Sequence, residues 1–215
     1  MFLPFFDRDS SARYLADLIA DADPPMQSLS LIGPRAADLA PRVKSLRPDL
    51  SVNVGDTAAD VVVSFDAIHL LPASTRTKAV QGIAALAGRE IIIACPLGTD
   101  LQLTIMRSLV KLAREHGVPV PDDLNLPLQH GLPTPPDAAG WAHGVSDLDL
   151  FYAGDVAFFQ DCATRHLAGA ALPAWRRTLL KFAAPDVSSV AEQPLPPETV
   201  PMRRHRRLFL ILRKR

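Results

Sequence analysis

Two short runs of uninterrupted apolar residues, separated by one helical pattern, constrain the fold of this 215-residue chain most strongly. Residues 60–65 read DVVVSF, and residues 90–94 read EIIIA. Unbroken β-branched runs of this length are typical of parallel strands buried on both faces. Residues 74–87 between them have amphipathic helical spacing, and Gly88 is expected to end that helix. The sequence therefore predicts two neighbouring parallel strands at the middle of one sheet.

The alternation of strand and helix patterns extends over the first half of the chain. Strand patterns lie at residues 28–32 and 50–54, and helical patterns lie at residues 11–22, 35–46 and 99–116. Pro41 is expected to kink or shorten the helix that contains it. Strands that alternate with helices form right-handed crossovers and a mostly parallel sheet with helices on both faces. The fold class is α/β, with about six strands.

The pattern loosens after residue 117. Residues 117–146 are rich in proline, and we expect an irregular segment that serves as a lid over a binding site, with one or two helical turns at residues 137–143. A strand is expected at residues 147–152 and a broken helix at 156–182, followed by a second proline-rich connection at 183–202. No internal repeat is visible, so one domain spanning residues 1–215 is the simplest organisation.

The charge balance of 23 basic against 23 acidic residues hides a basic C-terminal end. Residues 203–215 carry seven basic side chains, which leaves 16 basic and 23 acidic residues in the rest of the chain. Such an end could bind nucleic acid through phosphate contacts. It could also be a buried strand with charged flanks, and the apolar run at residues 208–212 favours this second interpretation.

Composition and motifs exclude several classes of protein. Hydrophobic residues make up 48% of the chain, enough for a packed core and too many for a disordered or collagen-like sequence. Cys95 and Cys162 are too few for a disulfide framework, and we expect a cytoplasmic protein without a signal peptide or membrane span. The six histidines lack zinc-ligand spacing, so no metal site is expected. P-loop, GxGxxG and GxSxG motifs do not occur.

Ligands of open parallel sheets bind beyond the carboxyl ends of the strands. The loops that follow the predicted strands hold Gly33, then Asp56, then Asp66 with His69, and then residues 95–98. Cys95 in the last loop could be a nucleophile, but no basic neighbour lowers its pKa, and a small buried hydrophobe is the favoured interpretation.

Two stretches of the chain resemble the class I S-adenosylmethionine-dependent methyltransferases. Residues 60–72 (DVVVSFDAIHLLP) and 89–98 (REIIIACPLG) are similar to the fourth strand, its loop and the fifth strand of that family. Residues 129–133 (QHGLP) resemble a histidine-and-GLP element of one branch, and residues 206–214 resemble the last, antiparallel strand. The resemblance implies a Rossmann-like fold, the cofactor S-adenosylmethionine and methyl transfer to a small-molecule, sugar or lipid-linked acceptor.

The resemblance also implies roles for particular residues. Gly33, Asp56, Phe65 and Asp66 would hold the cofactor, and His69 and His130 would face the acceptor as catalytic residues. Simpler roles remain open for several of them. Gly33 and Asp56 are equally suited to tight turns, and the two histidines to packing or loop hydrogen bonds.

The sequence departs from the family pattern in two places. The glycine-rich loop after the first strand is reduced to residues 33–37 (GPRAA), in which Pro34 removes a backbone donor. Only 27 residues separate the first strand from Asp60, so one strand–helix unit is missing. These departures leave open a catalytically inactive relative that serves as a binding or scaffolding subunit. Apolar residues within 156–182 could form a contact in a homodimer or larger protein complex, or belong to the intramolecular core.

Overall fold

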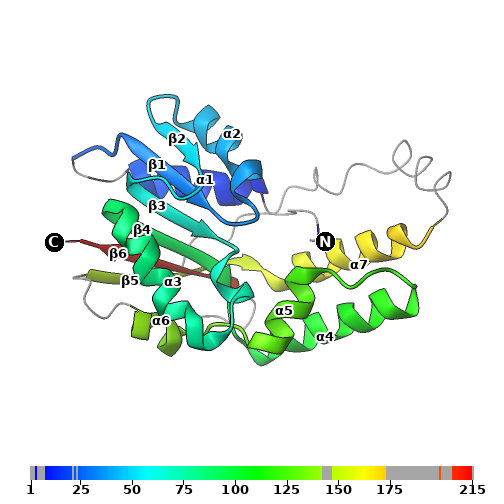
Figure 1. Cartoon of the computed structure of the whole chain (residues 1–215). Coiled ribbons are helices and arrows are strands. Elements are labelled where there is room, and N and C mark those ends of the chain that lie inside the picture. Colours follow the sequence, from blue (N-terminus) through cyan, green and yellow to red (C-terminus); the bar gives the residue numbers. More distant parts are fainter. Residues whose placement is uncertain are drawn as a thin grey trace.

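The two apolar runs form neighbouring strands at the middle of a six-stranded sheet, as predicted (Figure 1). The computed structural model describes residues 3, 8–20, 22, 24–141, 147–172, 199 and 205–214. The strands are β1 (Ser28–Ile32), β2 (Ser51–Val54), β3 (Ala59–Phe65), β4 (Ala87–Pro96), β5 (Asp147–Asp155) and β6 (His205–Arg213). The helices are α1 (Arg8–Ala20), α2 (Ala36–Leu46), η1 (Ile68–Leu70), α3 (Ala73–Leu86), α4 (Asp100–Glu115), α5 (Asp122–His130), α6 (Pro135–Trp141) and α7 (Val156–Ala170).

The sheet has the strand order β2-β1-β3-β4-β6-β5. Strands β1 to β4 pair in parallel, with Val62 opposite Ile91 in the central pair. Strand β6 inserts antiparallel between β4 and β5, with Ala94 opposite Phe209. The prediction of a mostly parallel sheet with an antiparallel last strand is therefore confirmed. The chain runs from β2 directly into β3, where the family resemblance expects one more strand and helix.

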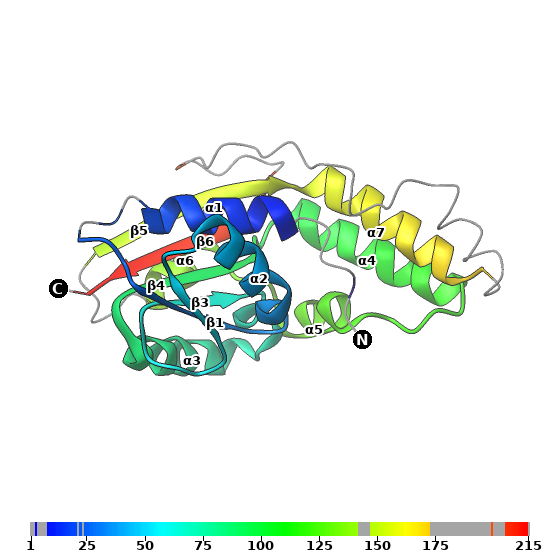
Figure 2. The same ribbon diagram turned by 90° about the horizontal axis from the view of Figure 1, so that it is seen from above.

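Helices cover both faces of the sheet because successive side chains of a strand point to opposite faces. Val61, Val63 and Phe65 of β3 pack with α1 and α2 in one apolar cluster. Val62 and Ile93 lie on the other face and pack with α3 and α6. Figures 1 and 2 show these helix pairs on opposite sides of the strands.

A third apolar cluster lies beyond the carboxyl ends of the parallel strands. It joins α4, α5 and α7, and Leu3 is buried in it. Figure 2 shows α4 and α7 running side by side away from the sheet. This cluster places three helices at the edge where the sequence predicts a ligand.

The proline-rich segment differs from its prediction. Residues 122–130 form α5, which was not predicted, whereas α6 overlaps the helical turns expected at residues 137–143. Pro121 occupies the N-cap of α5 and Pro135 begins α6, where no backbone N–H is needed, but Pro127 lies inside α5. Gly98 holds this segment against β4, because its N–H donates to the Pro133 carbonyl at 2.8 Å.

Two smaller predictions about element ends are wrong. Helix α2 runs unbroken through Pro41 and is not shortened. Gly88 does not end α3, because the chain enters β4 already at Ala87. Helix α7 is described to Ala170; the rest of the predicted helix, and the connection at residues 183–202 apart from Thr199, lie outside the described residues.

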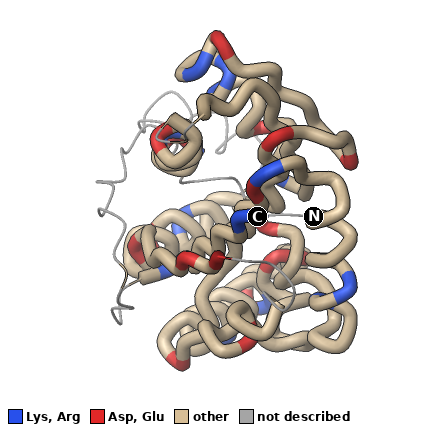
Figure 3. Tube along the Cα trace, turned by 90° about the vertical axis from the view of Figure 1, so that its left-hand side faces the viewer, with Lys and Arg blue, Asp and Glu red and all other residues tan. Residues whose placement is uncertain are grey.

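The basic C-terminal end forms a buried strand, as the apolar run predicted. Arg206 and Arg207 are 8% and 1% exposed within β6. Figure 3 shows acidic and basic residues interspersed over the described part of the trace. None of the described helices has the length and hydropathy that a membrane span requires.

Candidate functional site

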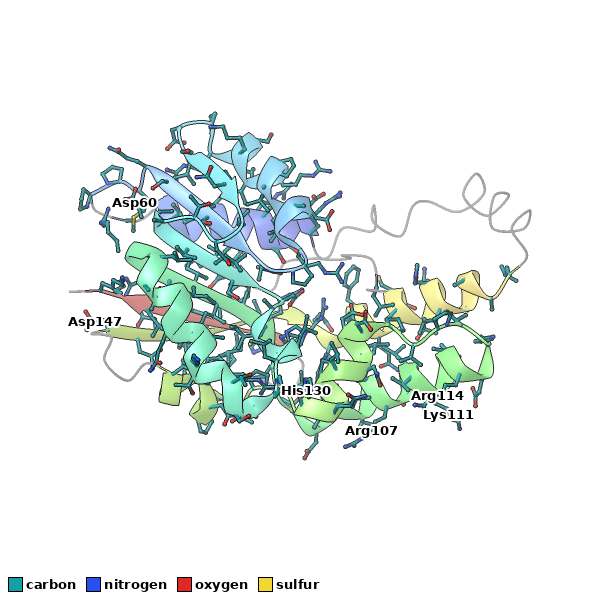
Figure 4. The ribbon with its side chains drawn as sticks, viewed as in Figure 1. Asp60, Arg107, Lys111, Arg114, His130 and Asp147 are labelled. Carbon is teal, nitrogen blue, oxygen red and sulfur yellow. The ribbon has the colours of Figure 1, made fainter. Side chains whose placement is uncertain are left out.

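A cleft opens at the carboxyl ends of β1, β3 and β4, where the sequence predicts ligand loops. It is narrow, with an enclosed volume of about 20 Å³, and α4, α5, α7 and the start of β6 complete its walls. Its polar lining consists of Arg35, Asp66, His69, Gln102, Asp123 and Arg206. Asp60 and Asp147 mark the opposite end of the sheet in Figure 4.

Asp66 forms a buried ion pair with Arg207. The two Arg207 Nη atoms lie 2.6 and 3.2 Å from the two carboxylate oxygens. Asp66 has a φ of +53°, a conformation that aspartate tolerates better than most residues. Burial alone would raise the pKa of Asp66, but the charge of Arg207 and its hydrogen bonds hold the pKa below the ordinary value. The carboxylate therefore stays ionised and is engaged by the protein itself.

His69 is a buried histidine with an unused nitrogen. The side chain is 2% exposed, and its buried Nδ1 has no hydrogen-bond partner among the described residues. Burial lowers the pKa of His69 to about 4, so the imidazole is neutral at pH 7. The Nδ1 atom of this neutral imidazole can therefore form one hydrogen bond with a molecule bound in the cleft.

Gln102 provides a second unused polar atom in the same cleft. Its side chain is 1% exposed, and within the part of the chain that the structure describes its Oε1 has no hydrogen-bond partner. The residue stands in the first turn of α4, where its backbone N–H is capped by Thr99 Oγ1 at 3.1 Å. Most buried polar atoms of folded proteins have partners, so two orphans in one cleft call for an explanation.

Arg35 and Asp123 hold the backbone of Leu3 at the wall of the cleft. The Asp123 carboxylate lies 3.1 Å from Arg35 Nη2, and both its oxygens lie 3.1 Å from the Leu3 N–H. Arg35 Nη2 also donates to the Leu3 carbonyl at 2.6 Å. Burial raises the pKa of Asp123, and the hydrogen bond from Leu3 and the charge of Arg35 oppose that shift.

The two predicted turn residues have contrasting surroundings. Gly33 has a φ of +119°, and a Cβ there would lie 2.4 Å from the Phe65 carbonyl oxygen. The close approach of two loops therefore accounts for this glycine, and its predicted cofactor contact stays a prediction. Asp56 is exposed beyond β2 and does not line the cleft. Because β2 pairs directly with β1, Asp56 follows the second strand, where the resemblance expects a carboxylate for the cofactor's ribose.

Three other residues of the sequence analysis do not line the cleft. Phe65 is fully buried, with the Arg207 guanidinium 4.7 Å from its ring centroid. His130 joins α5 to η1, because its Nδ1 lies 2.8 Å from the Leu70 carbonyl (Figure 4). Burial raises the pKa of Cys95 to about 12, which favours the small hydrophobe over the nucleophile. The catalytic role of His130 and the cofactor role of Phe65 stay predictions.

Sequence reasoning missed several residues of the cleft. Arg206 was assigned to a charged flank, but its guanidinium carbon lies 3.9 Å from the ring centroid of Phe159. Gln102 and Asp123 carry no local motif, since a helix N-terminus and a proline-rich segment are ordinary places for both residue types. The sequence feature that could have pointed to these residues is Arg35, a large cation in the loop that is rich in glycine in the family the chain resembles.

Comparisons with known proteins agree with this architecture. No protein-family model and no curated protein matches the sequence. The plantazolicin methyltransferase BpumL, solved with a triazolic desmethylPZN analog and SAH, has a TM-score of 0.53 and 11% identity over 98% of this chain and 85% of its own. A SAM-dependent methyltransferase from Archaeoglobus fulgidus has a TM-score of 0.51 and 9% identity over 96% of this chain and 92% of its own.

A weaker similarity covers only part of the chain. DesVI from Streptomyces venezuelae matches at 18% identity and a TM-score of 0.33, over 41% of this chain and 51% of its own. The fold assignment does not depend on this partial similarity. The two broader matches show that the chain has the fold of class I methyltransferases, in a strongly diverged form. Among the described residues, no three histidine, cysteine or acidic side chains gather as a metal site would need.

Proposed function

We propose that the chain is an S-adenosylmethionine-dependent methyltransferase that acts on a small-molecule, sugar or lipid-linked acceptor. The supporting observation is the pair of orphaned buried atoms, His69 Nδ1 and Gln102 Oε1, which line one cleft at the ligand edge of a methyltransferase fold. A buried polar atom without a partner costs about 1–3 kcal/mol. A bound ligand that supplies both partners removes that cost.

The polar lining of the cleft fits the methionyl end of the cofactor. Gln102 Oε1 is an acceptor for its ammonium group, and the Arg206 guanidinium supplies positive charge for its carboxylate. Asp56 is an exposed carboxylate at the end of β2 and fits the hydroxyls of the ribose. The cofactor supplies an electrophilic methyl group on a sulfonium sulfur.

His69 has a positioning role in this proposal. Its pKa of about 4 keeps the imidazole neutral, but so weak a base removes a proton from an acceptor with little driving force. A hydrogen bond from His69 would fix the orientation of the acceptor nucleophile. Methyl transfer then depends chiefly on proximity and alignment, which can account for much of an enzymatic rate enhancement.

One observation favours a second candidate function. The Arg35 side chain stands in the loop after β1 and is tied to Asp123 and Leu3, where the family has a small residue. A catalytically inactive relative that has become a binding or scaffolding subunit would tolerate such a filled loop. Under that alternative the cleft has no affinity for the cofactor.

Calorimetric titration with S-adenosylhomocysteine separates the two functions. The proposal predicts binding by the wild-type protein and binding at least about tenfold weaker for Gln102→Leu, from the loss of one hydrogen bond to a charged group. The same substitution removes an unsatisfied buried oxygen, so it should stabilise the ligand-free protein by about 1 kcal/mol. This combination of gained stability and lost affinity distinguishes a ligand-binding residue from a structural one.

Lys111→Ala is the matched control on the same helix. Lys111 is exposed on α4 outside the cleft (Figure 4), and its ion pair with Glu115 is a surface contact of 3.7 Å. Affinity and stability should both match the wild type. Absence of binding to the wild-type protein at millimolar ligand would contradict the enzyme and support the inactive relative.

A further inference from the structure

Strand β2 is an edge of the sheet, and no strand of the described residues pairs with its outer side (Figure 1). The N–H groups of Ser51 and Gly55 donate toward β1, at 2.8 and 2.9 Å. Successive residues of a strand direct their backbone groups to opposite sides within the sheet. The N–H and carbonyl groups of Val52 and Val54 therefore point outward, away from β1.

The two edges of the sheet differ in how they are protected. An open edge is a template for pairing with another chain, and natural proteins commonly prevent such pairing with charged side chains or proline. Strand β5, at the opposite edge, carries Asp147, Asp149 and Asp155. Strand β2 reads SVNV, with neither a charge nor a proline. Its outer side is therefore open to a further strand.

The exposed large apolar side chains of the described residues lie beside this edge. They are Leu46 and Val54, which are 44% and 53% exposed. Val52 packs with the cluster of α1 and α2, and Val54 points to the same face because it lies two residues further along the strand. Leu46 ends α2, which returns the chain from β1 to the start of the parallel strand β2. The two side chains therefore lie on one face, near opposite ends of β2.

The outer side of β2 is complementary to a second copy of itself. Antiparallel pairs alternate between residues that exchange hydrogen bonds in both directions and residues that do not. In an antiparallel pair centred on Asn53, Val52 lies opposite the partner's Val54, and both have outward N–H and carbonyl groups to exchange. Asn53 lies opposite the partner's Asn53 on a twofold axis. The backbone of β2 thus supplies the pattern that its own copy needs.

The charges and the apolar side chains fit the same antiparallel arrangement. Lys44 Nζ donates to the Leu50 carbonyl at 2.7 Å, just before the start of β2, and the exposed Asp56 follows its end. An antiparallel partner reverses the direction of the strand, so Lys44 comes to the end that carries the partner's Asp56. Leu46 likewise comes to the end that carries the partner's Val54. A parallel copy would instead bring like charges together.

We propose that β2 pairs antiparallel with β2 of a second copy of this chain, so that one continuous sheet crosses a homodimer with Asn53 on its twofold axis. The partner's strand then covers the edge that the missing strand–helix unit leaves open. The strand has four residues, so the interface is small and the dimer forms in a concentration-dependent way. A twofold contact uses the same surface on both copies, so assembly stops at the dimer.

Cysteine cross-linking tests the register directly. Asn53→Cys places two thiols opposite each other in a pair whose Cα atoms are about 4.5 Å apart, a separation that a disulfide spans. Ser51→Cys is the matched control, because Ser51 is exposed on the same strand and face but lies opposite the partner's Gly55. The native Cys95 and Cys162 are buried.

The expected result is a covalent dimer of one variant only. With an added thiol oxidant, Asn53→Cys should move on a non-reducing gel to twice the chain mass of 23.3 kDa, and a reductant should reverse the change. Ser51→Cys should stay chiefly at the mass of one chain. Equal cross-linking of the two variants, or none of Asn53→Cys, would overturn the proposed register.

Sedimentation of proteins without added cysteines gives a second measurement. The wild-type mass should rise with concentration from 23.3 kDa toward twice that value. Val54→Lys puts a charge at each apolar contact, and Val54→Pro removes an outward N–H that β1 does not use. Each should weaken the dimer by about tenfold or more, because the twofold axis doubles every loss. Val54→Thr keeps the branched shape and the N–H, and serves as the control that still dimerises.

The remaining outcomes are equally decisive once thermal melting has verified that each protein is folded. A wild-type protein that stays at 23.3 kDa up to its solubility limit would overturn the dimer. A dimer that persists unchanged in Val54→Lys and Val54→Pro would overturn the use of β2 and place the contact elsewhere. Growth beyond the dimer would overturn the twofold arrangement. None of these measurements involves the cofactor, so their failure leaves the proposed function intact.

Discussion

The loops after β1 and β2 both turn on a glycine with positive φ, yet their surroundings differ. At Gly33 the φ is +119°, and a Cβ built there would lie 2.4 Å from the Phe65 carbonyl oxygen. At Gly55 the φ is +111°, and a Cβ built there would have no non-neighbouring atom of the described residues within 4 Å. The first loop is packed against the end of β3 and borders a cleft of buried charges. The second is open and carries the exposed Asp56. The first loop is therefore held by close packing, whereas the second is held by hydrogen bonds of Gly55 to the Leu31 carbonyl and the Ser30 hydroxyl.

This difference has a consequence for binding. The half near β3 has its charges already paired and oriented, so a ligand there finds preorganised groups. The half near β2 contributes the exposed side chain of Asp56. Side-chain changes in the packed half should therefore alter the stability of the fold, whereas removal of the exposed Asp56 carboxylate should alter chiefly the affinity.

The largest expected effect is the loss of the buried ion pair in the packed half. Asp66→Asn keeps the shape and tolerates the positive φ, but it removes the negative charge that pairs with the buried Arg207 guanidinium. We expect the free energy of unfolding to fall by about 3–5 kcal/mol, measured by urea denaturation.

The control for this change is an ion pair on the surface. Arg213 pairs with Glu90 at 3.0 Å and with Asp149, and its side chain is 44% exposed. Arg213→Met should cost less than about 1 kcal/mol. Similar losses for the two variants would contradict the distinction between the packed edge and the surface.

The next effect is a dependence of stability on pH that comes from His69. Its pKa falls from 6.5 in the unfolded chain to about 4 in the folded protein, so between these values the unfolded state binds the extra proton. Burial of the neutral His69 therefore contributes to the free energy of unfolding fully above pH 6.5. About 3 kcal/mol of that free energy is lost as the pH falls to 4. His69→Gln should flatten the stability curve over this window, and parallel curves for both proteins would contradict the burial of a neutral His69.

A smaller effect compares the two glycines directly. Ala at either position adopts a strained φ, which costs about 1–3 kcal/mol. Gly33→Ala adds a collision with a backbone oxygen, so it should destabilise the protein by about 1–3 kcal/mol more than Gly55→Ala does. Equal melting temperatures for the two variants would show that the β1 loop is as open as the β2 loop.

The smallest effect on the fold is expected at Asp56. Asp56→Ala should change the free energy of unfolding by less than about 0.5 kcal/mol because the side chain is exposed. Its affinity for S-adenosylhomocysteine should fall about tenfold, from the loss of a hydrogen bond to a charged group. A loss of stability with unchanged affinity would identify Asp56 as a turn residue.

The sequence predicts the sheet well because its signals are local. The β-branched runs in β3 and β4 and the alternating pattern of β1 each lie within a few consecutive residues. Helix α5 was missed for a local reason, since proline predicts the end of a helix, yet Pro121 occupies its N-cap and the helix continues through Pro127.

The cleft was predicted less completely because its contacts are distant in sequence. Asp66 and Arg207 are 141 residues apart, and Arg35 and Asp123 are 88 apart. Neither pair leaves a spacing that a single sequence can reveal. The position of the cleft followed from the rule for parallel sheets, and the identity of its charged partners required the structure.

A crystal structure of the protein grown with S-adenosylhomocysteine is the most direct test of the account. We predict ligand density at the carboxyl ends of β1 and β3, with the methionyl ammonium group within hydrogen-bond distance of Gln102 Oε1. Crystals grown with saturating ligand whose cleft shows no ligand density would contradict the account.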